Sequence, residues 1–203
     1  MSILKIGIIG DTQTGKTSLI NVYIGVGFQD NIIPTIGIVD YVKKKELKSS
    51  NNNKYKLDII DTAGQEKYHS LALNIFKQCL GLILVYEIDN NETFDNIKNK
   101  WIKEINESFQ TKIPIVLVGN KKDLEKERII SEEEGKKLAE ENDFLFFETS
   151  AKTGENVNEI FQSLFEIIVK DIEKDIKSKK VEPNIGLNAC NNNIVIIKKK
   201  SWC

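Results

Sequence analysis

Blocks of apolar residues separated by polar segments predict strands and helices in turn along the chain. Continuous apolar runs, typical of strands buried on both faces of a parallel sheet, lie at 3–9, 81–88, 113–119 and 144–147. Two further strands, 41–47 and 55–60, flank the Ser/Asn-rich segment 49–53, so we expect them to pair as an antiparallel hairpin.

Helical periodicity fills the segments between these strands. In 93–109, and again from Val157 to Ile176, apolar residues recur every three or four positions, which predicts helices with one face against a core. Further helices are expected from Lys16 and from Ser131, where Ser131 and Glu134 have capping-box spacing. Alternating strands and helices predict an α/β domain with a mostly parallel sheet covered on both faces.

Length and composition fit one soluble domain with a tail. A chain of 203 residues suits a domain of about 160–170 residues, and the periodicity ends after Lys177. We therefore expect a domain over 1–176 and a flexible basic tail over 177–203. No apolar run approaches the ~18 residues that span a bilayer, and no signal peptide is expected. An odd count of three cysteines is typical of reduced thiols, with Cys79 in the core.

The distribution of charge separates the tail from the body. The net charge is −1, which gives no support to nucleic-acid binding. From Lys170 to Cys203 there are eight lysines and four acids, and the rest of the chain has 21 basic and 26 acidic side chains. A tail of +4 on a body of −5 predicts that the tail meets a negative surface.

The first apolar run leads into a glycine-bounded loop that matches the phosphate-binding pattern GxxxxGK[ST]. Its residues are Gly10, Asp11, Thr12, Gln13, Thr14, Gly15, Lys16 and Thr17. Glycines let the loop wrap an anion with its N–H groups, and the following helix presents its positive end to the same anion. Lys16 would contact the β and γ phosphates, and the Thr17 hydroxyl would ligate Mg²⁺. This pattern alone leaves ATP and GTP equally open.

Two downstream loops favour guanine as the base. Asp123, in the NKKD segment that follows a buried strand, can accept hydrogen bonds from guanine N1–H and its amino group, which adenine lacks. The stem of Lys121 can lie over the base, and Asn120 can tie this loop to the phosphate loop. In a second loop, Ser150-Ala151-Lys152, the Ala151 N–H would face guanine O6.

Together these motifs resemble the Ras-like small GTPases over residues 3–176. The chain carries GDTQTGKT, PTIG, DTAGQE, NKKD and ETSAK in the order of that family. The resemblance implies the P-loop NTPase fold of a small G-domain, with a six-stranded sheet flanked by five helices. It also implies a monomer that binds GTP or GDP with Mg²⁺ and slowly hydrolyses GTP to GDP and phosphate.

The resemblance also assigns roles to individual residues. Thr35 would complete the Mg²⁺ shell with Thr17 and Asp61, and Ser18 would complete the phosphate-binding set. The Phe28 ring would lie against the guanine, with a buried loop aromatic as the alternative.

Hydrolysis would depend on Gly64 and Gln65 in the DTAGQE motif, which the family uses as part of a segment that changes conformation with the bound nucleotide. The Gly64 N–H would bind the γ-phosphate, and Gln65 would orient the attacking water. No arginine stands in an obvious position to assist in cis, so fast turnover would need an activating protein. The β-branched Thr12 stands beside the γ-phosphate and would crowd an incoming arginine, so we expect assisted hydrolysis to be weakened.

Within the family, the segment from Asp61 to Ala72 is most similar to the Rab branch, which regulates membrane traffic. The chain departs from that branch at Ile60 and Ile75, and by one residue added between Gly37 and Tyr41. These positions would form the surface that effectors read, so we expect an unusual set of effectors beside an exchange factor and an activating protein.

The tail resembles a prenylation segment. Cys203 is the lipidation candidate, and Ile194–Ile197 resembles the motif that engages the prenylation escort protein, with a stray apolar patch as the alternative. One lipid binds membranes marginally, and Lys198-Lys199-Lys200 would add about 1 kcal/mol per charge near an anionic leaflet. We therefore expect a cytoplasmic protein attached peripherally to the cytosolic face of membranes.

Three other functions compete with a trafficking switch. A GTP-locked scaffold that hydrolyses poorly is favoured by Thr12 and opposed by Gln65 and Thr35. A Ras-type signalling GTPase outside the Rab branch also stays open. A P-loop phosphotransferase for small metabolites is disfavoured by the guanine-reading residues Asp123 and Ala151.

Overall fold

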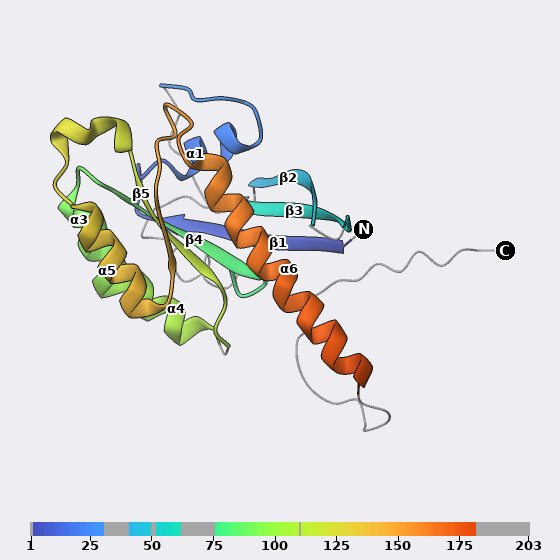
Figure 1. Cartoon of the computed structure of the whole chain (residues 1–203). Helices are drawn as coiled ribbons and strands as arrows, with labels where there is room; N and C mark the ends of the chain where they lie inside the picture. The colour runs from blue at the N-terminus through green and yellow to red at the C-terminus, as the bar shows by residue number, and fades with distance from the viewer. Residues whose placement is uncertain (1, 31–40, 50–51, 62–75, 110, 182–203) are drawn as a thin grey trace.

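A computed structural model of the chain describes residues 2–30, 41–49, 52–61, 76–109 and 111–181 (Figure 1). Its six strands are β1 (Ser2–Gly10), β2 (Tyr41–Lys48), β3 (Lys54–Asp61), β4 (Gly81–Glu87), β5 (Ile115–Asn120) and β6 (Leu145–Glu148). They form one sheet in the order β2-β3-β1-β4-β5-β6. β2 runs antiparallel to β3, and the other four pairings are parallel. The predicted hairpin and the predicted mostly parallel α/β sheet are confirmed.

The register brings the carboxyl ends of the parallel strands to one edge of the sheet. Gly10 at the end of β1 lies beside Val85 of β4, and Glu87 at the end of β4 lies beside Asn120 of β5. β1 lies inside the sheet between β3 and β4; the chain passes from β1 to the edge strand β2, returns to β3, and then crosses to β4 on the other side of β1. Open α/β sheets bind ligands at such a switch point, outside the carboxyl ends of the strands.

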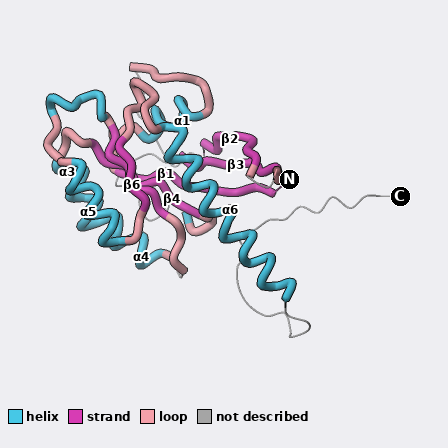
Figure 2. Tube along the Cα trace, in the orientation of Figure 1, coloured by secondary structure: helices cyan, strands magenta, loops and turns pink. Residues whose placement is uncertain are grey.

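Helices connect the strands (Figure 2). They are α1 (Lys16–Tyr23), α3 (Asn91–Asn96), the π-helical η2 (Ile97–Trp101), α4 (Ile102–Ser108), the 3₁₀ segment η3 (Lys122–Glu127), α5 (Glu132–Asn142) and α6 (Val157–Val181). The predicted helix over 93–109 is thus a continuous helical segment over 91–108 with a π turn inside it. The capping box at Ser131 is confirmed, since its hydroxyl accepts from Glu134 N and the Glu134 carboxylate accepts from Ser131 N.

Each face of the sheet has its own hydrophobic core. α1 and α6 cover one face, where the Tyr23 ring stacks on Phe161 with ring centroids 4.0 Å apart. The segments α3, η2, α4 and α5 cover the other face, and the second core includes Trp101 and Cys79. Cys79 is 2% exposed, as predicted for a core residue. Ile60, expected on the effector surface, is 4% exposed in the second core because alternate residues of β3 face opposite sides of the sheet.

α6 continues through the predicted domain boundary at 176/177 and ends at Val181. Its inward face carries Val157, Ile160, Phe161, Leu164 and Ile168, all buried as the periodicity predicts. No helix among the described residues combines the length and the apolar character needed to cross a membrane. The remainder of the predicted tail, 182–203, lies outside the described residues.

Candidate nucleotide-binding site

Two glycines shape the loop between β1 and α1. Gly10 has φ 142°, and a Cβ there would lie 2.2 Å from the Val85 carbonyl oxygen. Gly15 caps α1 with φ 87°, and a Cβ there would lie 2.3 Å from Asn120 Nδ2. Both positions combine positive φ with a close approach of another strand's end, so only glycine lets the loop curl above the sheet edge.

Lys16 lies inside this loop as a buried ammonium. Its side chain is 5% exposed, and Nζ donates to the backbone carbonyl of Asp11 and, at 3.4 Å, to Thr14 Oγ1. Burial lowers the pKa of Lys16 from 10.5 to about 8, although the carboxylates of Asp61, Asp11 and Glu87 act to raise it. A polyanion bound in the loop would offset this cost of desolvation, so the site favours a phosphate ligand.

The two described candidates for Mg²⁺ ligation lie together. Thr17 Oγ1, in the first turn of α1, donates to Asp61 Oδ2 at the end of β3 at 2.8 Å. Asp61 is 1% exposed. A buried carboxylate and a hydroxyl beside a phosphate-binding loop fit the oxygen-rich shell of Mg²⁺, which usually takes one or two protein ligands and completes its octahedron with phosphates and water.

Asn120 joins the phosphate loop to the two loops that were predicted to read guanine, 120–123 and 150–152, here called the base-reading loops. Its side chain is 1% exposed and sits at the end of β5. Nδ2 donates to the Thr14 carbonyl at 2.8 Å, which confirms the predicted tie. Oδ1 accepts from Thr149 Oγ1 at 3.0 Å and from Ala151 N at 3.3 Å. One buried amide therefore holds three separated segments in register.

Further hydrogen bonds connect the two base-reading loops. Ser150 Oγ donates to Asp123 Oδ1 at 2.6 Å and so orients the carboxylate that was predicted to read guanine. Lys122 N donates to the Thr149 carbonyl at 2.9 Å. Lys121 has a positive φ of 68°, and its Nζ lies 2.5 Å from Glu87 Oε1 at the end of β4. This ion pair fixes the direction of the Lys121 stem.

The comparisons with known proteins agree with this geometry. The Ras family model matches residues 5–170. The chain belongs to the Ras family. It is 36% identical to Ras-related protein Rab-13 of Bos taurus over 189 residues, 93% of this chain and 91% of that protein. It is 37% identical to Ras-related protein SEC4 of Saccharomyces cerevisiae over 196 residues, 95% and 88% of the two chains. It is 38% identical to Ras-related protein Rab-10 of Caenorhabditis elegans over 167 residues, 82% and 81% of the two chains.

The resemblance found in the motifs is thereby confirmed at the level of the family and of the Rab branch. The protein is a small GTPase that hydrolyses GTP. Members of the Ras family bind GTP and GDP, typically with Mg²⁺.

Some of the candidate residues lie outside the described part of the chain. Thr35, Gly64, Gln65, Ile75 and Cys203 are among them, as is the extra residue between 37 and 41. Of the described candidates, Thr12, Gln13, Asp123 and Lys152 are exposed, and Ser18 is half-buried. Phe28 is 38% exposed, so the alternative of a buried loop aromatic is wrong.

Sequence reasoning missed Arg128, which braces the base-reading loops. Its guanidinium donates to both Glu148 oxygens at 2.6 and 2.8 Å and to both Glu125 oxygens at 2.9 and 2.6 Å. Glu148 ends β6 directly before the loop that carries Ala151, and Glu125 lies in η3, so Arg128 connects both loops. The signal was that Arg128 is the only arginine of the chain.

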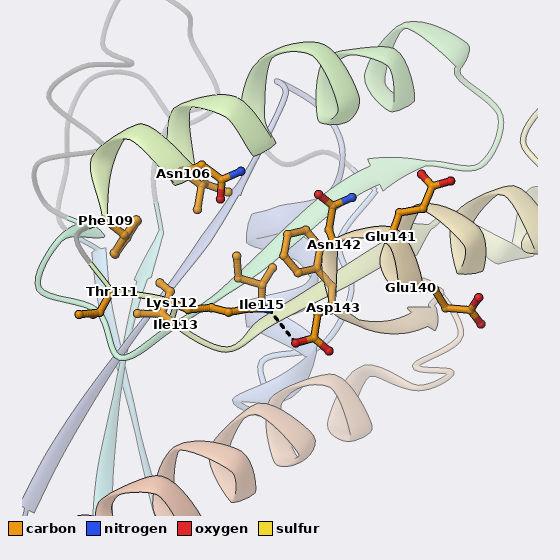
Figure 3. A pocket seen from close by; sticks show the side chains of 12 residues that line it. Asn106, Phe109, Thr111, Lys112, Ile113, Ile115, Glu140, Glu141, Asn142 and Asp143 are labelled. Carbon is orange, nitrogen blue, oxygen red and sulfur yellow. Dashed lines mark hydrogen bonds and ion pairs between the residues drawn. The ribbon is translucent and has the colours of Figure 1, made fainter.

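A separate pocket of about 460 Å³ lies between the ends of α4 and α5 (Figure 3). Lys112 Nζ and Asp143 Oδ2 form an ion pair across it at 2.7 Å. The pocket borders Ile115, where β5 begins, whereas the phosphate loop lies at the edge where β5 ends. It is therefore no part of the nucleotide site.

Proposed function

We propose that this protein is a GTP-driven switch of the Rab type in which Asn120 holds the phosphate and base subsites as one unit. The observation that supports this most directly is the triple attachment of Asn120 to Thr14, Thr149 and Ala151. A site built this way suits a ligand that carries a phosphate chain and a base together. Asp123 and Ala151, as the residues expected to read guanine, disfavour a phosphotransferase for small metabolites.

In this proposal, Lys16 and the loop N–H groups bind the β and γ phosphates. Thr17, Asp61 and Thr35 hold Mg²⁺, which neutralises the charge that develops on the phosphates when it is bound. Gly64 donates its N–H to the γ-phosphate, and Gln65 orients the attacking water. Loss of the γ-phosphate releases the segments around Thr35 and Gln65, so binding partners distinguish the two nucleotide states.

At the base, Asp123 accepts from guanine N1–H and the amino group, and the Lys121 stem lies over the ring. The bond from Ser150 to Asp123 holds the carboxylate in place. Phe28 is exposed enough to contact the other side of the base. A neutral adenine in this site would offer the carboxylate no donor pair, so the two hydrogen bonds that favour guanine would be lost.

Unaided hydrolysis is expected to be slow. The only arginine, Arg128, is committed to Glu148 and Glu125, so the chain offers no spare guanidinium to the phosphates. Family members without a cis arginine turn over on the order of 10⁻⁴ per second until an activating protein supplies one. We infer that an exchange factor and an activating protein set the cycle, and that effectors read the GTP state.

We also propose peripheral attachment to the cytosolic face of membranes. Cys203 would carry a prenyl group, delivered by an escort protein that engages Ile194–Ile197, and Lys198-Lys199-Lys200 would add attraction to anionic lipid. Intact-mass spectrometry of the protein from its native cell is expected to show the added prenyl mass. An unmodified Cys203 would end this part of the proposal.

The test of the switch begins with the bound nucleotide. Chromatography of the nucleotide released from purified protein is expected to yield GDP and GTP, and adenine nucleotides would refute the proposal. A phosphate-release time course of GTP-loaded protein, with Gln65→Leu as the matched control, then separates a slow hydrolase from a locked scaffold. Release no faster from the native protein than from Gln65→Leu would favour the scaffold.

A further inference from the structure

The carboxylate of Asp11 is held from outside the phosphate loop. Asp11 is the second residue of the loop, and its side chain points away toward the helical segment on the second face of the sheet. Asn96 Nδ2 donates to Oδ2 at 2.7 Å, and Trp101 Nε1 donates to Oδ1 at 2.8 Å. Each carboxylate oxygen thus has a neutral donor 85 or 90 residues away in the sequence.

The π turn explains how both donors reach the same carboxylate. Asn96 and Trp101 are five residues apart, and in a regular α-helix such residues point about 140° apart around the axis. The segment between them is π-helical, and its closing bond runs from Ile102 N to the Ile97 carbonyl, five residues back. Widening one turn brings residues at i and i+5 toward the same side. The irregular helix therefore presents its two donors as a pair.

The negative charge of a bound polyphosphate explains why the phosphate loop needs the donors Asn96 and Trp101. A carboxylate next to Thr12 would repel a bound polyanion, most of all at the γ position, unless it were turned away and stabilised elsewhere. With the carboxylate held by the helix, the backbone carbonyl of Asp11 stays inside the loop, where it accepts from Thr14 Oγ1 at 3.0 Å and from Lys16 Nζ.

We propose that Asp11 is a positioning residue, and that Asn96 and Trp101 keep its carboxylate out of the γ-phosphate position and so favour the triphosphate over the diphosphate. This inference rests on the proposed function, because it takes the γ-phosphate to lie beside the loop. It links the relative affinity for GTP and GDP to the position of the π turn, since any movement of that turn alters the hold on the carboxylate.

The test measures dissociation rates of fluorescent GTP and GDP from full-length protein with Mg²⁺ present. Trp101→Phe keeps an aromatic side chain but removes the indole N–H donor, and Asn96→Ala removes the other donor from a half-buried position. Each variant is expected to speed GTP dissociation about tenfold, because it removes one hydrogen bond to a charged group. GDP dissociation is expected to become at most about threefold faster. Asn91→Ala is the matched control, because the Asn91 side chain, on the same helix, donates an exposed hydrogen bond to Asp95 rather than to Asp11.

A second substitution distinguishes charge from packing. Asp11→Asn removes the negative charge, so adding it to Trp101→Phe is expected to restore slow GTP dissociation. Equal acceleration for GTP and GDP, or no restoration by Asp11→Asn, would overturn the inference and leave a purely structural contact. If Trp101→Phe does not fold, Asn96→Ala and its Asp11→Asn double variant decide the question alone. If the native protein binds no guanine nucleotide, the proposed function itself fails.

Discussion

The substitution Arg128→Lys tests whether a single guanidinium braces the guanine-reading loops. Arg128 makes five hydrogen bonds, four to the carboxylates of Glu148 and Glu125 and one to the Ile130 carbonyl. The side chains of Arg128 and Glu148 are only 17% and 3% exposed. A lysine keeps the charge but cannot contact two carboxylates with paired, parallel N–H groups.

The expected loss follows from the buried half of this arrangement. Glu148 loses two charge-assisted hydrogen bonds and regains one at best, and each such bond contributes about 1.5–3 kcal/mol. We therefore expect the free energy of unfolding to fall by about 2–3 kcal/mol. For a chain of this size that corresponds to a drop in Tm of about 4–12 °C.

The effect should extend to nucleotide binding. The Glu148 carbonyl accepts from Asn156 Nδ2 at 2.7 Å, and the next residues form the loop that faces the base. Loosening Glu148 is expected to speed GDP dissociation while leaving the secondary structure intact.

The assay is thermal unfolding at a fixed excess of GDP and Mg²⁺, together with GDP dissociation rates. Glu125→Gln is the matched control, because Glu125 is a surface carboxylate, 62% exposed, that shares Arg128 with Glu148. Surface ion pairs contribute little, so this variant should unfold near the native temperature. If Arg128→Lys and Glu125→Gln lowered Tm equally, the paired hydrogen bonds from Arg128 to the buried Glu148 would not be the source of the stability, and the reasoning would be refuted.

Two other predictions test the site and the core. Asn120→Ala should weaken GDP binding about 10- to 100-fold, as measured by isothermal titration. The substitution leaves the Thr14 carbonyl without its buried donor and removes the link between the two base-reading loops. An affinity within twofold of native would contradict the role of Asn120. Burial raises the pKa of the Cys79 thiol from 9.0 to about 12, so the folded protein keeps this proton up to pH values at which an unfolded thiol has lost it. Iodoacetamide at pH 9 should therefore label Cys79 in urea but not in the native protein, as read by peptide mass spectrometry, and equal labelling would show that the thiol is accessible.

Local patterns were sufficient for most of the fold. Apolar runs predicted the strands because a parallel strand buried on both faces must be apolar throughout. The capping box at Ser131 and the hairpin around 49–53 were predictable because their partners lie within a few residues. The phosphate loop could be read directly, since the conformations of Gly10 and Gly15 depend on residue type.

Contacts that depend on the tertiary structure could not be predicted from the sequence. Arg128 stands in Glu125-Lys126-Glu127-Arg128, which by composition is an ordinary solvated charged segment. Ile60 was expected on the effector surface because of the resemblance to the Rab branch, yet the alternation of β3 turns it into the second core. Glu87 gave no signal either, because its ion pair with Lys121 depends on β4 and β5 being neighbours.

The sequence by itself determined the order of elements, the phosphate-binding loop, the preference for guanine and the family, because each is encoded in short motifs whose chemistry is local. Only the tertiary structure decided that Asn120 links three loops, that Arg128 braces two of them, and that a π turn holds the carboxylate of Asp11. Apart from the local bonds of Arg128 to Glu125, those contacts join residues 20 to 106 positions apart. They form because the strand order brings the carboxyl ends of β1, β4, β5 and β6 to one edge, and no local pattern specifies that order.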